Sequence, residues 1–335
     1  MKQTAYSILD LAIVSKGNSF RDTFDHSLAL AQAADKAGYK RFWMAEHHNS
    51  DAIGSSATSI LIGKIAEGTK RIRVGSGGIM LPNHSPFIVA EQFGTLGILY
   101  PNRIDLGLGR APGTDQETAA AIRSDFQQAA MSFPNEVQKI QTYFSPENSI
   151  SNVRANVAEG VDVPLYILGS STDSAHLAAK KGLPYAFASH FATTHLTAAI
   201  DIYREEFKSS SELDKPYVLA GVNVIVADTI EEAERISTSL YERVVGILTG
   251  NRDYMQPPIK MSDEVRNLSQ HPAVQQMLKY SFFGTKESVK TGIKEFIETT
   301  QVDELIVATN IYDGADRIKS YRAFAEIMDE LNSED

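Results

Sequence analysis

The sequence contains no cysteine among its 335 residues. Disulfide bonds, a thiolate nucleophile and cysteine-based metal sites are therefore excluded. It also has no apolar run close to the ~20 residues that a membrane helix needs, and no cluster of basic residues. Lys and Arg number 32 against 42 Asp and Glu, which gives a net charge of −10. Nucleic acid and anionic membranes are therefore poor candidate partners.

The amino-terminal stretch MKQTAYSILDLAIV lacks the features of a signal peptide, because it has one lysine, a short apolar run and no small-residue cleavage site. We interpret it as a first strand and expect a cytoplasmic protein. The composition, 43% hydrophobic and 22% charged, is typical of a globular protein with a sizeable core. A single α/β barrel with insertions fits this length. Since no linker separates two halves, we expect one domain over residues 1–335.

Short apolar runs alternate with longer amphipathic stretches along the chain, as in βα units that build a parallel sheet. Eight such runs are present, and eight is the strand number of a (β/α)8 TIM barrel. The sequence therefore predicts an α/β fold of this type. The expected strands are Tyr6–Val14, Arg41–Glu46, Ile72–Met80, Ile104–Gly109, Pro164–Gly169, Tyr185–Ser189, Tyr217–Ala227 and Glu304–Thr309.

Two connections are too long to be plain loops, namely Gly113–Asp162 after the fourth run and Thr249–Thr285 after the seventh. We expect helical insertions at both places, shaping a substrate pocket. The second contains TGNRDYMQPPIKMSDEV, which is polar and includes a Pro-Pro pair. We interpret it as a mobile lid with a partly structured base.

The active site of such a barrel lies where the strands end, so the segments that follow the apolar runs are the ones to weigh. The fifth run passes through Gly169 into SSTDS, which offers Ser170, Ser171 and Ser174 in the first turn of a helix. Free N–H groups and hydroxyls at a helix N-terminus can hold a phosphate. Alternatively, Ser171 or the following Thr172 is only an N-cap.

Arg110 follows the fourth run in GLGRAPG and offers a permanent cation for a phosphate dianion. The alternative is a salt bridge at the rim. The segment is not a dinucleotide fingerprint, because Pro112 takes the third glycine position and no helix begins directly there.

Glycines interrupt the third run at Gly75, Gly77 and Gly78. Glycine weakens a strand, so it is expected where the backbone bends or closely approaches a flat ligand. A plain bulge is the alternative explanation.

Two histidines, His47 and His48, follow Glu46 at the end of the second run. Adjacent strand residues point to opposite faces, so the pair cannot readily share one metal ion, and no metal site is expected. Either histidine could be structural, satisfied by Glu46. The other possibility is that one of them is a catalytic acid or base.

Four motifs in order at successive strand ends carry a family resemblance: WMAEHHN, VGSGGIMLPNHSPFIVAEQFGTL, NRIDLGLGRAPG with Asn102 in place of a glycine, and YILGSSTDSAHLAAKKGLPYAFASHF. Together they resemble the bacterial-luciferase-like family of flavin-dependent monooxygenases. The resemblance extends over about residues 5–330 and is strongest between 40 and 195. SILDLA and GRAPG resemble the single-subunit branch rather than a luciferase α or β chain.

The resemblance implies a (β/α)8 barrel that binds reduced FMN, usually delivered by a separate reductase. Reaction with O2 gives a C4a-peroxyflavin, which oxidises a small organic substrate. His47 matches the catalytic histidine of the family. Gly77–Gly78 matches a non-proline cis peptide bond beneath the flavin ring. The phosphate ligands of the family are matched by Arg110, Ser170, Ser171 and Ser174.

One position departs from the luciferase pattern, because Gly109 stands where luciferases carry a cysteine close to the flavin. We expect a wider oxygen pocket there. Light emission and a long-chain aldehyde substrate are therefore not carried over.

We accordingly predict an FMN-dependent monooxygenase in which His47 manages protons. The alternatives are a reductase that uses a flavin or deazaflavin without oxygenation, and a flavin-binding protein without turnover. The substrate itself is not predicted, but we expect the pocket walls to include Tyr6, Ala188 and His190. A homodimer is implied by resemblance alone.

Overall fold

A computed structural model describes residues 3–147, 152–251 and 253–334. Its strands are β1 (Ala5–Asp10), β2 (Arg41–Met44), β3 (Arg73–Met80), β4 (Ile104–Gly109), β5 (Leu165–Gly169), β6 (Tyr185–Phe187), β7 (Val218–Val226), β8 (Ser281–Gly284) and β9 (Glu304–Ala308). Its helices are α1 (Phe20–Lys36), α2 (Thr58–Glu67), the short 3-10 helix η1 (Leu81–Asn83), α3 (Pro86–Leu99), α4 (Gln116–Ile122), α5 (Phe126–Met131), α6 (Phe133–Phe144), α7 (Thr172–Lys181), α8 (Leu196–Glu206), α9 (Ile230–Thr249), α10 (Asp263–Ser269), α11 (Pro272–Met277), α12 (Lys286–Thr300) and α13 (Gly314–Ser333).

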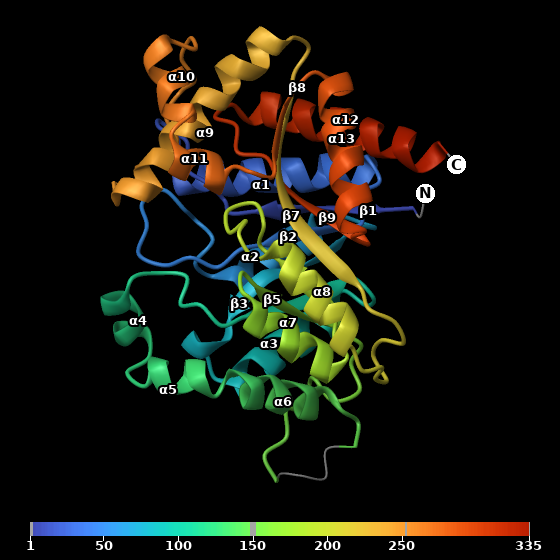
Figure 1. The fold of residues 1–335 in the computed structure, drawn as a ribbon. Helices are drawn as coiled ribbons and strands as arrows, with labels where there is room; N and C mark the ends of the chain where they lie inside the picture. The colour runs from blue at the N-terminus through green and yellow to red at the C-terminus, as the bar shows by residue number, and fades with distance from the viewer. Residues whose placement is uncertain (1–2, 148–151, 252, 335) are drawn as a thin grey trace.

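Eight parallel strands close into a ring. β1 to β6 pair in sequence order, β7 follows β6, and β9 lies between β7 and β1. Helices cover the outside of the ring (Figure 1). The predicted (β/α)8 TIM barrel is therefore confirmed.

The strands are buried on both faces, as a parallel sheet requires. The larger apolar cluster fills the layer between the sheet and the helices, and includes Ile8, Phe42 and Leu106. A smaller cluster, which includes Trp43 and Tyr166, belongs to the side chains that alternate with these along the strands. The interior of the barrel is thus filled rather than open.

The first strand is shorter than predicted, because β1 ends at Asp10 and not at Val14. Ala12 adopts a φ of 48°, which no strand residue has. The Asp10 carboxylate accepts a hydrogen bond from the Ala12 N–H at 3.0 Å and stabilises this turn. The other seven predicted strands agree with the structure to within two residues at each end.

Both predicted insertions contain helices, and the second also contains a strand. The range Gly113–Asp162 includes α4, α5 and α6, although residues 148–151 lie outside the described residues. The range Thr249–Thr285 includes α10 and α11, and ends in β8, which was not predicted. β8 lies outside the ring and pairs with the last part of β7. Figure 1 shows α4, α5, α10 and α11 on the same side of the barrel.

The segment interpreted as a mobile lid is fixed to the barrel at Met255; its residue 252 lies outside the described residues. The Met255 N–H donates to the Val14 carbonyl at 3.0 Å, and the Lys16 N–H donates to the Met255 carbonyl at 2.9 Å. Met255 is 1% exposed. The segment is therefore attached to the barrel at this point, and the movement of the rest stays a prediction.

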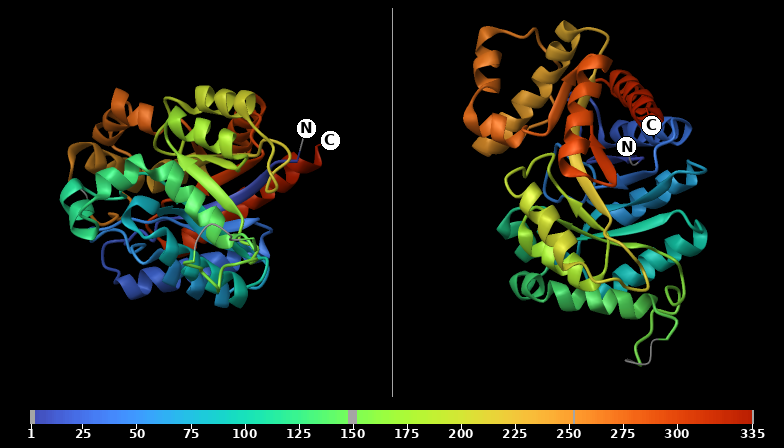
Figure 2. Two further views of the ribbon diagram at one scale, coloured as in Figure 1. Left: turned by 90° about the horizontal axis from the view of Figure 1, so that it is seen from below. Right: turned by 45° about the vertical axis from the view of Figure 1, so that its right-hand side comes forward.

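The two ends of the described chain lie side by side (Figure 2). The Thr4 N–H donates to Asn332 Oδ1 at 2.9 Å, and Asn332 Nδ2 donates back to the Thr4 carbonyl at 3.1 Å. These bonds connect the entry of β1 to the end of α13. Within the described ranges, no helix has the length and apolar content needed to cross a bilayer.

Candidate active site

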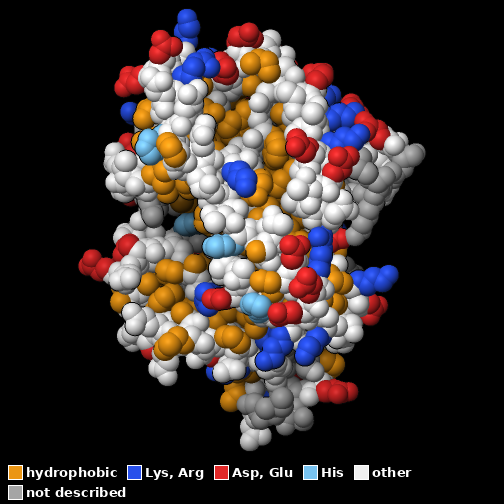
Figure 3. Space-filling model, viewed as in Figure 1, with side chains coloured by type: hydrophobic (Ala, Val, Ile, Leu, Met, Phe, Trp, Pro, Cys, Tyr) orange, Lys and Arg blue, Asp and Glu red, His pale blue; other side chains and the backbone are white. Residues whose placement is uncertain are grey.

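A cavity of about 540 Å³ opens at the carboxyl ends of the strands. Figure 3 shows that this face of the molecule is hollowed between its upper and lower parts, with histidine side chains beside the hollow. The strand ends supply most of its inner wall, and α9 with the following segment supplies the outer wall. Several residues that the sequence analysis had named line this cavity: Glu46, His47, His48, Gly77, Gly109, Gly169, Ser170, Ala188 and His190.

Tyr6 does not belong to this wall, contrary to the sequence-based expectation. Its ring is buried among Tyr39 and Phe324, in the layer between sheet and helices. Its hydroxyl donates to Asp329 Oδ1 at 2.8 Å. Because Tyr6 is the second residue of β1, it lies near the opposite end of the barrel from the strand termini that form the cavity.

The Glu46 carboxylate organises the rim of the cavity. It accepts hydrogen bonds from His48 Nε2 and His84 Nε2, both at 2.9 Å, and from the Met80 N–H at 3.0 Å. Asn83 Nδ2 is a further donor at 3.2 Å. Burial raises the pKa of Glu46, but the hydrogen bonds from His48 and His84 outweigh it and lower the pKa to about 2. An ionised carboxylate therefore connects the ends of β2 and β3.

His48 has the structural role that was one of the alternatives for this pair, since its ring bonds Glu46. His47 instead lines the cavity, and its backbone N–H donates to the Ser55 carbonyl at 3.2 Å. The two rings thus diverge after the strand, as alternation predicts. Both histidines line the cavity, but the His48 ring is engaged by Glu46, so His47 is the better candidate to act on a ligand there.

A third histidine, His190, lines the cavity and follows β6. Burial, together with the nearby His47, lowers the pKa of His190 to about 4. Its ring contacts Phe191 edge to face, with ring centroids 4.9 Å apart. From the sequence, His190 was expected only as a wall of the pocket.

The Gly77–Gly78 peptide bond is cis, as predicted. Neighbouring protein atoms already exclude side chains at both positions. A Cβ on Gly77 would lie 2.8 Å from Leu9 Cδ1, and one on Gly78 would lie 2.8 Å from the carbonyl oxygen of Gly107. The pairing of β3 with β4 also shifts register between Ser76 and Ile79, so the bulge alternative is present as well.

Arg110 and the first turn of α7 lie next to each other. Arg110 Nη2 donates to Asp173 Oδ2 at 3.2 Å, and both side chains are exposed. Ser171 is the N-cap residue, but its side chain makes no capping hydrogen bond within the described structure. The first-turn N–H groups therefore stay available to an anion. Ser171 thus has the N-cap position that was one of the alternatives, but without a capping bond from its side chain.

Ser174 is directed away from an anion at this turn. Its hydroxyl lies 2.7 Å from the Ser171 carbonyl and 3.0 Å from Tyr185 Oη. A Cβ on Gly169 would overlap the same hydroxyl, so Gly169 is required here by close packing. Ser174 shapes the turn in this structure, and its contact with a phosphate stays a prediction.

The expected extra space at Gly109 is occupied. A Cβ at this position would lie 2.8 Å from Met80 Cε and 3.1 Å from Met80 Sδ. The thioether of Met80 therefore occupies the volume that a side chain at position 109 would take.

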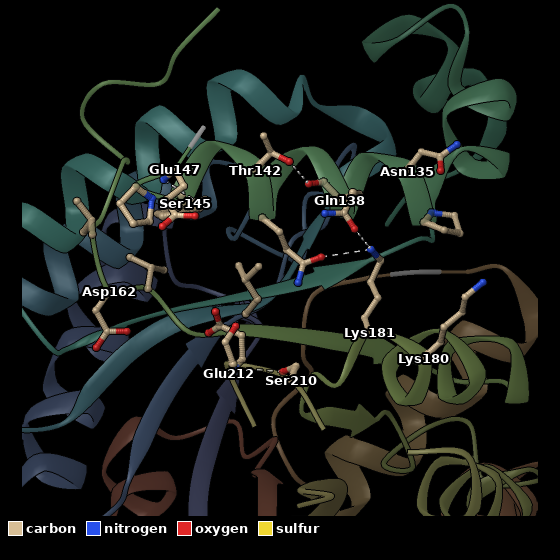
Figure 4. A pocket seen from close by; sticks show the side chains of 18 of the residues that line it. Asn135, Gln138, Thr142, Ser145, Glu147, Asp162, Lys180, Lys181, Ser210 and Glu212 are labelled. Atoms are coloured by element: carbon tan, nitrogen blue, oxygen red, sulfur yellow. Dashed lines mark hydrogen bonds between the residues drawn. The ribbon is translucent and has the colours of Figure 1, made fainter. Parts of the chain in front are cut away.

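A larger cavity of about 1160 Å³ lies elsewhere, between α6, α7 and the segments that precede β5 and β7 (Figure 4). Lys181 Nζ donates there to Gln138 Oε1 at 2.9 Å and to Gln141 Oε1 at 3.2 Å. None of the predicted site residues lines it. Size alone therefore does not identify the active site, and the cavity at the strand ends is the candidate.

Two partners of Glu46, Asn83 and His84, were not identified from the sequence. The sequence nevertheless contained a signal for them. LPNH follows the third apolar run, at the end of the strand, where functional side chains of a barrel are found. What the sequence did not reveal is their common acceptor.

Comparison with known proteins identifies the family of the chain. The family model described as luciferase-like monooxygenase matches residues 7–304. The chain is 44% identical over 330 residues to a luciferase-like monooxygenase of Escherichia coli strain K12, covering 98% of each chain. It is 30% identical over 329 residues to the N-acetyl-S-alkylcysteine monooxygenase of Bacillus subtilis, covering 96% of this chain and 97% of the relative.

Among solved structures, apo-MsnO8 is similar with a TM-score of 0.88 and 32% identity, covering 97% of this chain and 98% of that chain. The match thus extends over the whole barrel and both insertions. The chain belongs to the luciferase-like monooxygenase family.

Proposed function

We propose that this member of the luciferase-like monooxygenase family uses reduced FMN and O2 to oxidise a small organic substrate. That it is a flavin monooxygenase follows from the family. The observation that carries the finer proposal is the convergence of His47, Gly77 and Ser170 on one cavity of about 540 Å³.

The residues present fit FMN in two respects. The uncapped first turn of α7, with Ser170, Ser171 and the neighbouring Arg110, offers N–H groups, hydroxyls and a cation to a phosphate. The apolar inner wall, which includes Leu9, suits a flat aromatic ring beside Gly77. We therefore assign the phosphate to the turn and the ring to the barrel mouth.

When bound, reduced FMN supplies the activation of oxygen at its C4a position. The chain itself would orient the ring, exclude water by means of α9 and the following segment, and handle protons at the imidazole of His47. The hydrogen bond between Glu46 and His48 fixes the backbone on either side of His47.

The substrate class proposed is a small organic molecule, because the cavity has the volume for one and its lining combines apolar side chains with polar and charged ones, Asn223 and His190 among them. A relative carries the name N-acetyl-S-alkylcysteine monooxygenase, which indicates a compound of that size. We also propose that a separate reductase supplies the reduced flavin and that the protein is cytoplasmic.

A homodimer of single-domain chains is part of the proposal. The exposed face of α2 and α3 carries large apolar side chains, which suit an interface between two copies. These residues are Ile60, Ile88, Ile98 and Leu99. Light scattering at micromolar concentration would give twice the mass of the chain, 36.8 kDa, if the proposal holds.

The test of function begins with quenching of FMN fluorescence by the protein. The complex is then reduced without oxygen and mixed with aerated buffer in a stopped-flow instrument. A transient oxygenated flavin, followed by substrate-dependent O2 uptake, supports a monooxygenase. Immediate reoxidation with no transient favours a reductase, and binding without turnover favours a flavin-binding protein. Preference for a deazaflavin over FMN would overturn the cofactor assignment.

A further inference from the structure

His190 is held in one orientation at the end of β6. Asn223 Nδ2 donates to the His190 carbonyl at 2.6 Å and to Ser281 Oγ at 3.1 Å. The ring packs on the backbone of Gly221, where an added Cβ would lie only 2.4 Å from His190 Nδ1. With Phe191 against its side, the ring has little freedom to turn.

The two nitrogens of this ring have different surroundings. Nδ1 is buried against Gly221 and has no hydrogen-bond partner among the described residues. His190 lines the cavity, and because Nδ1 lies against Gly221 we infer that Nε2, on the other side of the ring, is the nitrogen directed to it. A buried N–H without an acceptor carries a full desolvation penalty. The ring proton therefore belongs on Nε2, where a ligand can accept a hydrogen bond from it.

We propose that His190 is a further catalytic residue, whose Nε2–H donates a hydrogen bond to the oxygen atom that gains negative charge as dioxygen is reduced in the cavity. This inference rests on the proposed function, because that function places oxygen and flavin there. The proton stays on Nε2 throughout, and only a hydrogen bond forms. His47 faces the same cavity and keeps the separate role of moving protons.

The environment supports this division of roles. Burial and the neighbouring His47 lower the pKa of His190 to about 4, so the ring is neutral at pH 7 and becomes charged only in acid. A neutral imidazole with so low a pKa seldom takes up a proton at pH 7, but its N–H can donate a hydrogen bond throughout the reaction. Two similar groups with different surroundings commonly divide catalytic work in this way.

The first test needs no flavin. Histidine side-chain ¹⁵N NMR of the whole protein, assigned with a His190→Gln variant, reports the position of the ring proton directly. We expect a neutral ring protonated at Nε2 from pH 8 down to pH 6. A proton on Nδ1, or a charged ring in this range, would overturn the proposal whatever the activity.

The second test uses reduced FMN and O2 alone. In this reaction reduced FMN passes two electrons and two protons to O2, giving FMN and hydrogen peroxide. His190→Leu removes the donor, and reoxidation of bound reduced FMN should slow by about tenfold, the effect of one lost hydrogen bond. His190→Gln restores an N–H and should stay within about threefold of the wild type. The matched control is His176→Leu, at an exposed site on α7.

Gly221→Ala gives an independent check, since it leaves His190 in the sequence but displaces its ring. It should resemble His190→Leu in reoxidation rate. Gly63→Ala, where the added Cβ would meet only ordinary contact at 3.5 Å, should not. Equal rates in wild type and His190→Leu, or equal loss in the Leu and Gln variants, would refute donation. Failure of the wild type to bind FMN would instead refute the proposed function and leave the NMR result standing.

Discussion

The side chains of three successive residues after β2 point in different directions. Two of them have a structural role, and one has a catalytic role in our proposal. Glu46 turns toward Asn83 and His84, His48 turns back to Glu46, and His47 faces the cavity. Because the carboxylate is buried and fully engaged, it fixes the backbone on which His47 is carried. The effects of substitutions at these positions should therefore differ in kind.

His47→Ala should bind FMN almost normally, because the proposed phosphate site lies elsewhere. Product formation should fall by about 10²–10⁴-fold, the contribution of a positioned acid or base, while hydrogen peroxide rises. His48→Ala should lower the melting temperature with little change in coupling. The measurement is the ratio of product to peroxide with an accepted substrate. Uncoupling by His48→Ala alone would mean that the two roles are reversed.

Arg110→Ala should weaken FMN binding by about 1.5–3 kcal/mol, the range for a hydrogen bond to a charged group. Riboflavin has no phosphate and should bind both proteins alike. Arg154→Ala is a matched control, since Arg154 pairs with Glu159 on the surface away from the cavity. Titration of flavin fluorescence measures all three proteins, and an unchanged FMN affinity in Arg110→Ala would remove this residue from the site.

Glu46 should make stability depend on pH in acid. Its folded-state pKa of about 2 lies below the ordinary value of 4.5, so its contribution is complete above pH 4.5 and is lost as the pH falls toward 2. The loss is on the order of 3 kcal/mol. Urea unfolding at several pH values should show a steeper decline for the wild type than for Glu46→Gln. Parallel curves would show that the carboxylate is not paired in solution.

The sequence was informative about the site wherever side chains follow a strand directly. His47, Gly77 and Ser170 could be found in this way, since a barrel places all strand ends together. The common dependence of His48 and His84 on Glu46 could not, because it is set by rotamers and by the turn at η1. The inward direction of Ser174 depends on Tyr185 and was equally hidden.

At the scale of elements, the insertion after β7 is partly built into the barrel. Met255 bonds the β1–α1 connection through its N–H and carbonyl, and β8 extends the sheet beside β7. These bonds leave only the stretch between them, with α10 and α11, as a candidate for movement. Any closure of this insertion over the cavity would then involve only that stretch.

Hydrogen exchange tests this arrangement. The amides of Met255 and Lys16 should exchange slowly, because both are hydrogen-bonded and Met255 is buried. The amides of Lys260 and Met261, which follow the Pro-Pro pair and have no hydrogen-bond acceptor among the described residues, should exchange faster by comparison. Rapid exchange at Met255, equal to that of its neighbours, would show that this attachment opens in solution and that the whole segment moves.

The eight barrel strands could be predicted because each is a continuous apolar run, as expected for strands buried on both faces. β8 could not, since its four residues, Ser281–Gly284, are mostly half-buried and its partner lies more than fifty residues away. The end of β1 was also missed, because the turn at Ala12 depends on the Asp10 side chain and not on hydrophobicity.

At the scale of the whole molecule, a buried ionic cluster closes the end of the barrel opposite the cavity. Arg41 Nε donates to Glu304 at 2.7 Å and Arg41 Nη1 donates to Asp105 at 2.9 Å. The side chains are 2% exposed or less. Arg41 Nη1 also donates to the Tyr166 hydroxyl, and Trp43 Nε1 donates to Asp105. The cluster joins β2, β4 and β9 from inside.

Arg41→Met should lower the free energy of unfolding by up to about 3–5 kcal/mol, because Asp105 and Glu304 lose their buried cation and keep only the less buried Arg73 and Lys40 as ion-pair partners. FMN affinity of the folded variant should not change, since the cluster lies far from the strand ends. Arg21→Met is the control, at an exposed pair with Asp25, and should have no measurable effect. Denaturant unfolding checks the first expectation. A variant as stable as the wild type would show that the carboxylates take up protons at little cost.

β7 is shared between two partners, and Asn223 is the residue at which they meet. β9 pairs with Leu219–Asn223 and β8 pairs with Asn223–Val226. For protein engineering, this makes the chain between α9 and α12 a cassette with a defined attachment point. A segment of another length could be exchanged for it if its last residues form a strand that pairs with β7 and offers a hydroxyl to Asn223. Substrate range could then be changed by grafting, with the barrel and its histidines left as they are.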